Sequence, residues 1–498
     1  KASQRDIVLQ VGGKVRVELV VQVAGTTTSI EVTGTLTGVE TETATLSGVV
    51  TGNQILNLAL PARNFVALAL LVPGAAPTNG LNTDAVGVLG NVEVSFNGGR
   101  TVYNTWEIDG GNNSDRGSNS TLNTYPSLDS IGEFRVSTSN YGADIGQHSG
   151  AHIQVSTKSG QRDFHGSVYE FLRNDKLNAN NFFTNRQTLG SIPERNPHKR
   201  NEYGYTVGGP IYIPGKYNTA KDKTFFFWSQ AWRKFRDSSV VSRSVPTLRQ
   251  RGGDFSDCLE GHANFNQALV DDGCTFPSNA DPVTGRLPSV DPNGVELLNA
   301  FIPLPNSGAY NYISSSSTPV NWRQEQIRVD HNFSDRTRLY VRYTQDAWDT
   351  ITPNALWAWS SVDTVKTAFG GPGKSAVLNF AHTFTPSLFS EFIMGYTVDH
   401  IDLRVQPGST STGLTKSSSF NAPHIFPEHD GNPYLPSLAV CGGSQMCAAQ
   451  TWWFDYGPYN SNPIITWKEN LTWIKGKHTV KFGAYVERFR KNEQFGGG

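Results

Sequence analysis

The sequence predicts a mainly β protein. A small α+β unit is followed by part of an antiparallel transmembrane β-barrel and preceded by the end of a β-sandwich. No apolar run reaches the length of about 18 residues that a membrane helix needs, so any membrane crossing requires strands closed into a barrel. The chain has 49 glycines and 11% aromatic residues but only 37% hydrophobic residues, a composition typical of strands, turns and aromatic girdles. Connections between the C-terminal strands are alternately short and long, as in barrels that span membranes.

Residues 1–36 are predicted to be the last strands of a β-sandwich. Apolar residues alternate from Ile7 to Val11 and from Val15 to Val23, and Gly12-Gly13 supplies the turn between them. Two or three strands are marginally stable alone, so we expect earlier strands to precede this sequence. The first residues lack the charged start and apolar core of a signal peptide. We therefore expect the sequence to be a fragment of a longer protein.

Residues 37–160 are predicted to form a compact α+β unit. Two short apolar segments, Asn53–Leu60 and Asn64–Leu71, predict helical turns that end close to a proline. Strands are expected at 92–96, 105–108, 133–137 and 152–156. A loop rich in Asp, Asn, Gly and Ser, residues 109–124, separates the second of these strands from the third.

Residues 161–498 are predicted to form the first part of the barrel. Nine segments have the composition and partial alternation of strands: 164–173, 201–212, 224–242, 324–333, 337–348, 375–385, 388–402, 463–474 and 478–490. Short connections are expected at 213–223, 334–336, 386–387 and 475–477, and long ones at 174–200, 243–323, 349–374 and 403–462. Single-chain bacterial barrels have even strand numbers, so nine strands indicate that further barrel strands follow.

The alternation within the strands assigns their two faces. In the segment 338–348, Leu339, Val341 and Tyr343 share one face, and Arg342 lies on the other. Lys481 and Glu487 are expected to line a wet lumen, because a charge facing hydrocarbon is costly. A soluble sandwich strand with one solvated face has the same alternation, and only the asymmetry of the connections separates the two interpretations.

The four cysteines form two local pairs, Cys258 with Cys274 and Cys441 with Cys447. No histidine lies at metal-ligand spacing, so we favour two small disulfide-closed loops in an oxidising compartment over free thiols. The net charge of −1 offers no electrostatic case for nucleic acid as a partner. No cofactor is expected.

Oxygen-bearing side chains concentrate in the loop after the strand at 105–108: Asp109, Asn112, Asn113, Asp115 and Asn119. They could contact a polar ligand or coordinate Ca²⁺, but the spacing lacks the EF-hand pattern and its terminal Glu. The plainer interpretation is a turn whose backbone is satisfied by its own side chains. His148 and His152 flank Gly150 in a predicted strand approach, where spacing of four does not suit chelation, and a structural role is favoured.

Aromatic runs are the other candidate binding feature. Trp452, Trp453 and Tyr456 lie in a long connection and could form a surface patch that stacks on a ligand, although loop packing explains them equally simply. The run from Phe225 to Trp228 follows a short connection and is predicted to belong to an interface girdle. No Gly-Xaa-Ser-Xaa-Gly elbow is present, so we expect no enzymatic activity.

Several motifs, in this order and spacing, resemble those of TonB-dependent outer-membrane receptors of the Oar-like type. The most specific are Gln54-Ile55-Leu56-Asn57-Leu58, Leu60-Pro61-Ala62-Arg63-Asn64-Phe65, Trp106-Glu107-Ile108-Asp109-Gly110, Ser130-Ile131-Gly132-Glu133-Phe134 and Ser156-Thr157-Lys158-Ser159-Gly160. The resemblance covers nearly the whole chain. Ala62 departs from the family, which commonly has Gly at that place.

The resemblance implies a carboxypeptidase-regulatory-like sandwich in 1–36, a plug in 37–160 and a barrel of about 22 strands in the bacterial outer membrane. It implies TonB of the inner-membrane energising complex and outer-membrane lipid as partners. The extracellular ligand is unknown: an oligosaccharide, a peptide or a chelated metal. Two alternatives stay open, namely an outer-membrane adhesion or structural barrel without active uptake, and a soluble secreted carbohydrate-binding β protein.

Overall fold

The computed structural model describes residues 43–60, 62–179, 197–271, 273–308, 311–352, 365–407, 415–421, 435, 441–442, 446–447 and 459–494. Two sheets dominate it, one of five strands and one of twelve. The strands predicted in 1–36 lie outside the described residues. None of the helices in the described ranges is long and apolar enough to cross a membrane.

The five-stranded sheet forms the centre of residues 43–160, which we call the inner unit. Its strand order is β1-β6-β7-β4-β5, and only the pair β4 and β7 is parallel. The strands are β1 (Leu46–Thr51), β4 (Thr105–Ile108), β5 (Gly111–Asn112), β6 (Ile131–Ser139) and β7 (His152–Thr157). A small second sheet pairs β2 (Ala75–Pro77) with β3 (Val94–Phe96), and the helices are α1 (Gly52–Asn57), η1 (Phe65–Leu71), η2 (Gly87–Leu89), η3 (Thr101–Tyr103) and η4 (Leu128–Ser130).

The core of the inner unit is built around Phe65. Its ring centroid lies 6.0 Å from that of Trp106, 6.2 Å from that of Tyr125 and 6.4 Å from that of Phe134, each pair edge to face, the arrangement that aromatic rings prefer. The side chain of Asn64 accepts a hydrogen bond from the backbone N–H of Val66 at 3.1 Å and so caps η1. The helical turn predicted at 64–71 is therefore a 3₁₀ helix whose first residue fills the core.

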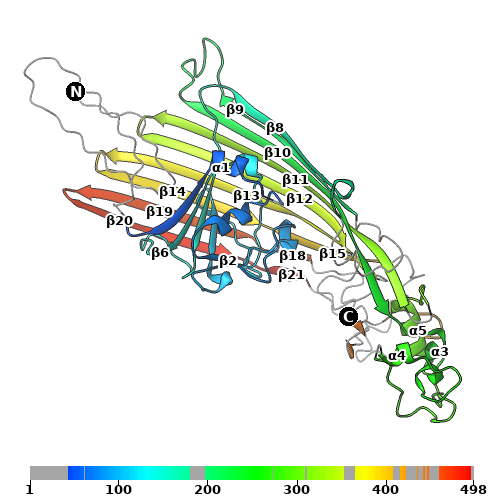
Figure 1. Ribbon diagram of the computed structural model, residues 1–498. Helices are drawn as coiled ribbons and strands as arrows, with labels where there is room; N and C mark the ends of the chain where they lie inside the picture. The colour runs from blue at the N-terminus through cyan, green and yellow to red at the C-terminus, as the bar shows by residue number, and fades with distance from the viewer. Residues whose placement is uncertain are drawn as a thin grey trace, which may run out of the picture.

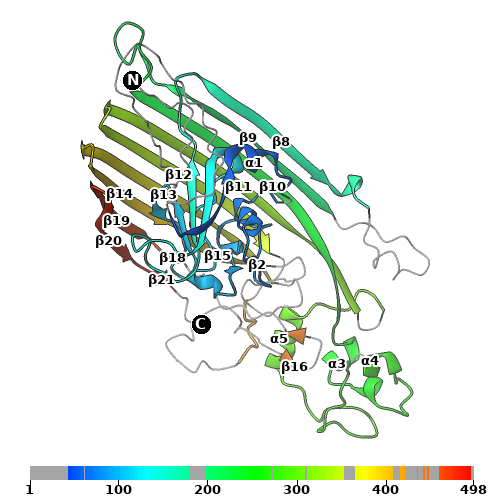
Figure 2. The same ribbon diagram turned by 60° about the vertical axis from the view of Figure 1, so that its left-hand side comes forward.

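The twelve-stranded sheet, which we call the wall, follows the chain order with antiparallel neighbours. Its main path runs β20-β19-β14-β13-β12-β11-β10-β9-β8, and β15, β18 and β21 branch from it. The strands are β8 (His165–Asn174), β9 (His198–Pro210), β10 (Thr224–Ser244), β11 (Asn311–Ser334), β12 (Thr337–Thr352), β13 (Val365–Thr385), β14 (Leu388–Val398), β15 (His400–Pro407), β18 (Tyr459–Ser461), β19 (Ile464–Lys475), β20 (His478–Phe489) and β21 (Asn492–Gln494). The mainly β prediction with a large antiparallel sheet is confirmed. Figures 1 and 2 show the inner unit lying against one face of this curved sheet.

The connections differ at the two ends of the wall, as predicted, but the long connection predicted at 349–374 spans only 353–364, because β12 and β13 extend into it. At the short rim the strands are joined by 335–336, 386–387, 476–477 and the longer 211–223. At the long rim the connections include 175–197 and 245–310. Gly476 has a φ of 62°, so the turn between β19 and β20 needs the left-handed conformation that glycine adopts without strain.

The wall has an outward and an inward face, and β12 shows both. Val341 and Tyr343 are 43% and 39% exposed. Their neighbours Arg342 and Thr344 are buried against the inner unit. Because strand side chains alternate, the apolar set faces away from the inner unit and the polar set faces it. The face assignment predicted for 338–348 is correct.

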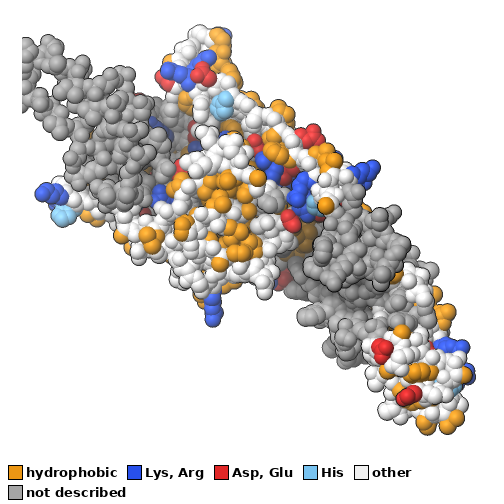
Figure 3. Space-filling model, in the orientation of Figure 1, with side chains coloured by type: hydrophobic (Ala, Val, Ile, Leu, Met, Phe, Trp, Pro, Cys, Tyr) orange, Lys and Arg blue, Asp and Glu red, His pale blue; other side chains and the backbone are white. Residues whose placement is uncertain are grey.

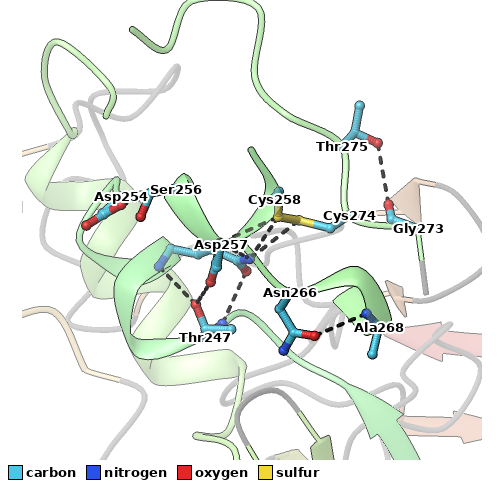
Figure 4. Close-up of a disulfide and its surroundings, with 11 residues drawn as sticks. Thr247, Asp254, Ser256, Asp257, Cys258, Asn266, Ala268, Gly273, Cys274 and Thr275 are labelled. Carbon is cyan, nitrogen blue, oxygen red and sulfur yellow. Dashed lines mark hydrogen bonds between the residues drawn. A yellow bond between two sulfur atoms is a disulfide. The ribbon is translucent and has the colours of Figure 1, made fainter. Parts of the chain in front are cut away.

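The connection at the long rim between β10 and β11 contains helices that were not predicted: α3 (Leu248–Arg251), η6 (Ser256–Cys258), α4 (Gln267–Asp271) and α5 (Pro292–Phe301). The predicted disulfide between Cys258 and Cys274 is present (Figure 4), with a Cα–Cα distance of 6.1 Å. Beside it, the hydroxyl of Thr247 donates to Asp257 Oδ2 at 2.7 Å. For the second pair, β16 (Cys441–Gly442) and β17 (Met446–Cys447) set Cys441 opposite Cys447 in register, but these two side chains lie outside the described part of the chain.

Candidate functional site

The loop that was predicted to bind a ligand, residues 109–124, lies on the side of the inner unit that faces the wall. Asp109 is its first residue. Asp109 follows β4 in the left-handed conformation, with a φ of 52°. The backbone N–H and the hydroxyl of Thr157 donate to its carboxylate at 2.9 and 2.8 Å. From the wall, Arg342 Nε lies 2.8 Å from Oδ2 and Arg328 Nη1 lies 3.5 Å from Oδ1. Asp109 thus joins two inner-unit strands to β11 and β12.

Asn112 contacts β20, at one end of the main path of the wall. Its side-chain amide donates to Glu487 Oε2 at 2.9 Å and to Gln147 Oε1 at 3.3 Å. Arg116 Nη2 lies 2.6 Å from Glu487 Oε1, and on the same strand Lys481 Nζ lies 2.5 Å from Asp144 Oδ2. Lys481 and Glu487 are therefore on the inward face of β20, as the alternation predicts.

Asn113 and Asp115 stabilise the loop itself. Asn113 donates to the carbonyl oxygen of Thr124 at 2.8 Å and accepts from the Thr124 hydroxyl at 2.8 Å. Asp115 accepts from the N–H of Gly117 at 2.8 Å and from the N–H of Ser118 at 3.1 Å. These bonds are what a turn satisfied by its own side chains requires, and a ligand role for this loop stays a prediction.

A second charged cluster joins η1 and η4 to the wall, and the sequence analysis did not find it. Arg63 Nη2 lies 2.8 Å from Asp129 Oδ2, and Arg63 Nε lies 3.3 Å from Glu202 Oε1. Arg233 Nε lies 3.3 Å from the other oxygen of Glu202. The Arg63 guanidinium also covers the ring of Phe171, with 3.7 Å to the centroid. In the sequence, Arg63 stood out only as part of the motif Leu60–Phe65. Its ion-pair partners could not be found there, because they lie far away along the chain.

The backbone of the inner unit is also bound directly by wall side chains. Asp346 Oδ2 accepts from the N–H of Tyr125 at 2.8 Å. Gln324 accepts from the N–H of Ser127 at 2.8 Å and donates to the carbonyl oxygen of Tyr125 at 2.7 Å. The segment before η4 therefore docks on β11 and β12 through polar groups that are all buried.

The two histidines of the inner unit have separate surroundings. His152 Nε2 lies 3.1 Å from Glu107 Oε2, and Lys468 Nζ of the wall lies 3.8 Å from the other oxygen. Burial opposes ionisation of Glu107, but the charges of His152 and Lys468 outweigh it and lower the pKa of Glu107 to about 2. Burial and the neighbouring Arg116 lower the pKa of His148. Among the described residues no group of three or more His, Cys, Asp or Glu side chains is arranged to hold a metal ion.

The predicted aromatic patch of Trp452, Trp453 and Tyr456 lies outside the described residues. The other aromatic run begins β10 directly after a connection at the short rim. There the ring centroids of Phe226 and Phe164 lie 6.4 Å apart.

Figure 3 shows that hydrophobic side chains gather on the face of the inner unit that is turned away from the wall.

Comparisons with known proteins agree with this architecture. Residues 156–497 match the family model described as the outer membrane beta barrel domain. The chain is 27% identical over 166 residues to the TonB-dependent transporter Oar of Myxococcus xanthus, an alignment that covers 33% of this chain and 14% of that protein. The fold is similar to that of the outer membrane transporter YddB from Escherichia coli, with a TM-score of 0.51 and 11% identity over 90% of this chain and 48% of that one.

The chain thus spans about half the length of the solved transporter that it matches. Both of these relatives are named as transporters. The family match covers most of the sequence, including every main strand of the wall. The chain belongs to the outer membrane beta barrel domain family of the bacterial outer membrane.

Proposed function

We propose that this chain is part of a TonB-dependent receptor that takes up an extracellular ligand through a plugged barrel. In this proposal residues 37–160 are the plug, residues 161–498 are the first part of the barrel, and residues 1–36 end a preceding sandwich. A ligand binds at the long rim, and TonB transmits force from the inner-membrane energising complex to the plug. The plug then shifts within the barrel and opens a path.

The supporting observation is the polar contact between the inner unit and the wall. It includes Asp109 with Arg342, Arg63 with Glu202, and Arg116 with Glu487. Such buried pairs stabilise a folded state little in net terms, since water solvates the same charges when the pairs separate. An apolar contact of equal area would resist separation and rehydration more strongly. Apolar wall side chains, among them Trp322, Trp348 and Phe369, also pack in the core cluster of the inner unit. The polar pairs are the part of the junction that suits a plug that has to move.

The long rim supplies the surface that meets the ligand. The region between β10 and β11 is stiffened there by a disulfide and by α5, whose first turn is capped by Asp291, which accepts from the N–H of Asn293 at 2.8 Å. Ligand contacts are proposed for Trp452, Trp453 and Tyr456 and for the loop from Asp109 to Asp115. The ligand classes remain an oligosaccharide, a peptide or a chelated metal.

A disulfide tether between the inner unit and the wall tests plug movement. A Cβ built on Gly395 of β14 lies 3.2 Å from the Cα of Gly111 in β5, close enough for a disulfide. Thr466 Oγ1 and Val377 Cγ2, at 2.5 and 2.7 Å from the two new Cβ atoms, have to move to admit it. We combine Gly111→Cys and Gly395→Cys with the reporter Ser127→Cys, because Ser127 is buried between the inner unit and β10. Maleimide labelling of the reporter is followed in energised cells, with and without a protonophore.

We expect labelling of the reporter that stops when the protonophore is added or when the tether is oxidised, and that returns on reduction. The two single cysteine variants at 111 and 395 serve as matched controls, because they cannot form the tether. Labelling that ignores both the protonophore and the tether, or no labelling at all, would contradict the proposal. Either result would favour the alternative function, an adhesion or structural barrel without active uptake.

A further inference from the structure

A buried carboxylate without partners lies where β14 ends and β15 begins. Asp399 is 4% exposed, and in the described part of the chain neither of its carboxylate oxygens has a hydrogen-bond partner. It follows Thr397 by two residues, and the Thr397 hydroxyl accepts a hydrogen bond from the side chain of Asn123 in the inner unit. Because strand side chains alternate, Asp399 also faces the inner unit.

Two asparagines on the neighbouring segment add further oxygens of the same kind. The backbone N–H of Asn462 donates to the carbonyl oxygen of Asp399 at 3.4 Å, which places these two residues opposite each other. Asn460 lies two residues earlier, opposite Ile401 in β15, and therefore on the same face. Both asparagine side chains are more than nine-tenths buried, and the oxygen of each has no partner among the described residues.

A second carboxylate comes from the inner unit. Asn462 Nδ2 donates to Asp115 Oδ1 at 3.1 Å, which leaves the amide oxygen of Asn462 as the unpartnered end. Asp115 lies near enough for its negative charge to act on Asp399. Lys491, which directly precedes β21, is paired with Glu493 at 2.7 Å. Asp399, Asn460 and Asn462 thus bring together four buried acceptor oxygens without a hydrogen bond of good geometry, and the side-chain amide of Asn462 is the donor that lies close to Asp399.

Burying acceptors of this kind is unfavourable unless a cation or a hydrogen-bond donor meets them. A hard cation with oxygen ligands does so, and Ca²⁺ accepts carboxylate and amide oxygens in irregular geometry, whereas Mg²⁺ demands a near-ideal octahedron. We propose that Asp399, Asn460 and Asn462 form a calcium site at the junction of the inner unit and the wall. Asp115 is a positioning residue, because it orients the amide of Asn462.

The site has a structural consequence beyond the proposed transport function. It joins the wall, at the point between β14 and β15 where Asp399 lies, to the turn of the inner unit that begins at Asp115. The alternative occupant is a proton on Asp399, which would be donated to the amide oxygen of Asn462. The two occupants predict different results for Asp399→Asn, which removes the charge and preserves the shape. If calcium occupies the site, the variant loses calcium affinity; if a proton does, the variant becomes more stable.

The test is calorimetric titration of CaCl₂, and separately of MgCl₂, into the detergent-purified protein. We expect calcium to bind with a Kd of about 10⁻⁴ to 10⁻³ M, typical of extracellular sites, and to prefer calcium over magnesium. Asp399→Asn should weaken calcium binding about tenfold or more. The matched control is Asp335→Asn, which removes an exposed carboxylate at the short rim and should leave the affinity unchanged.

Unchanged calcium binding in Asp399→Asn would overturn the proposal. So would a wild-type protein that takes up no calcium while Asp399→Asn melts at a higher temperature, and that result would assign a bound proton instead. If Asp399→Asn fails to insert, Asn460→Ala decides the matter, since it removes one oxygen without a charge. It should weaken calcium binding several-fold, and an unchanged Kd in this variant counts against the site.

Discussion

Asp109 shows how a single residue can be held in a strained conformation by its partners. Its φ of 52° costs an ordinary L-residue about 1 kcal/mol or more, and short polar side chains such as Asp tolerate it best. The strain places the carboxylate between Thr157 of the inner unit and Arg342 of the wall. This backbone conformation thus lets one carboxylate contact both the inner unit and the wall.

Removing Asp109's partner should be severely destabilising. Arg342→Met leaves the buried Asp109 carboxylate with only the more distant Arg328 at 3.5 Å as its counter-charge, so we expect a loss of about 3 kcal/mol of unfolding free energy. Combining it with Asp109→Asn should recover part of this loss, because no uncompensated charge then remains. Denaturant unfolding in detergent measures both. The control Lys481→Met removes a partly exposed pair with Asp144 and should cost no more than about 1 kcal/mol.

Glu107 should make the stability of the inner unit depend on pH. Its pKa is lowered to about 2 in the folded protein, so it contributes stability above its ordinary pKa of about 4.5 that is lost as the pH falls towards 2. The shift corresponds to roughly 3 kcal/mol. Glu107→Gln should flatten the fall in unfolding free energy between pH 5 and pH 2. An equally steep fall in this variant would show that other carboxylates control the acid transition.

Within a single strand, the alternation of outward and inward side chains predicts most of the observed structure. In β12 the outward Val341 and the inward Arg342 are neighbours with opposite surroundings, which a period of two dictates. The alternation weakens at the beginning of β11, where Ser314 to Ser317 are followed by Thr318. This strand was predicted to begin at 324 but begins at Asn311, since it is held by pairing with β10 rather than by apolar side chains.

A charge on the outward face should hinder membrane insertion. We expect Val341→Arg to cost between about 1 and 4 kcal/mol, depending on its depth in the bilayer. Val283→Arg is the matched control, because Val283 is exposed in the connection at the long rim. Folding into liposomes, followed by heat-modifiable gel migration, compares the two. Equal folding yields would contradict the assignment of the lipid face.

The disulfide should stabilise only the connection between β10 and β11 in which it lies. Replacing Cys258 and Cys274 by serine opens a loop with a sequence separation of 16, and we expect a local loss of about 3 kcal/mol. Protease cleavage within 245–310 should become faster, while migration of the folded barrel stays the same. A change in barrel migration would mean that this region supports the wall as well.

At the scale of the whole molecule, the strands were predictable and the junction was not. Period-two patterns and turn residues are local, so the nine main segments and the rim asymmetry follow from the sequence alone. The pairing of Arg63 with Glu202 joins residues 139 positions apart, and no local pattern encodes such a partner. The break at Asp399 between β14 and β15 was also missed, because the predicted segment 388–402 alternates without a proline or glycine at that point.

The pairing of Arg116 with Glu487 spans 371 positions, and this separation sets an order of assembly. The aromatic nucleus around Phe65 draws on residues between Phe65 and Phe134, so it can form early during synthesis. The charged partners on β19 and β20 emerge from the ribosome much later. Until β19 and β20 pair with it, the charged side chains of the inner unit that meet these two strands stay hydrated.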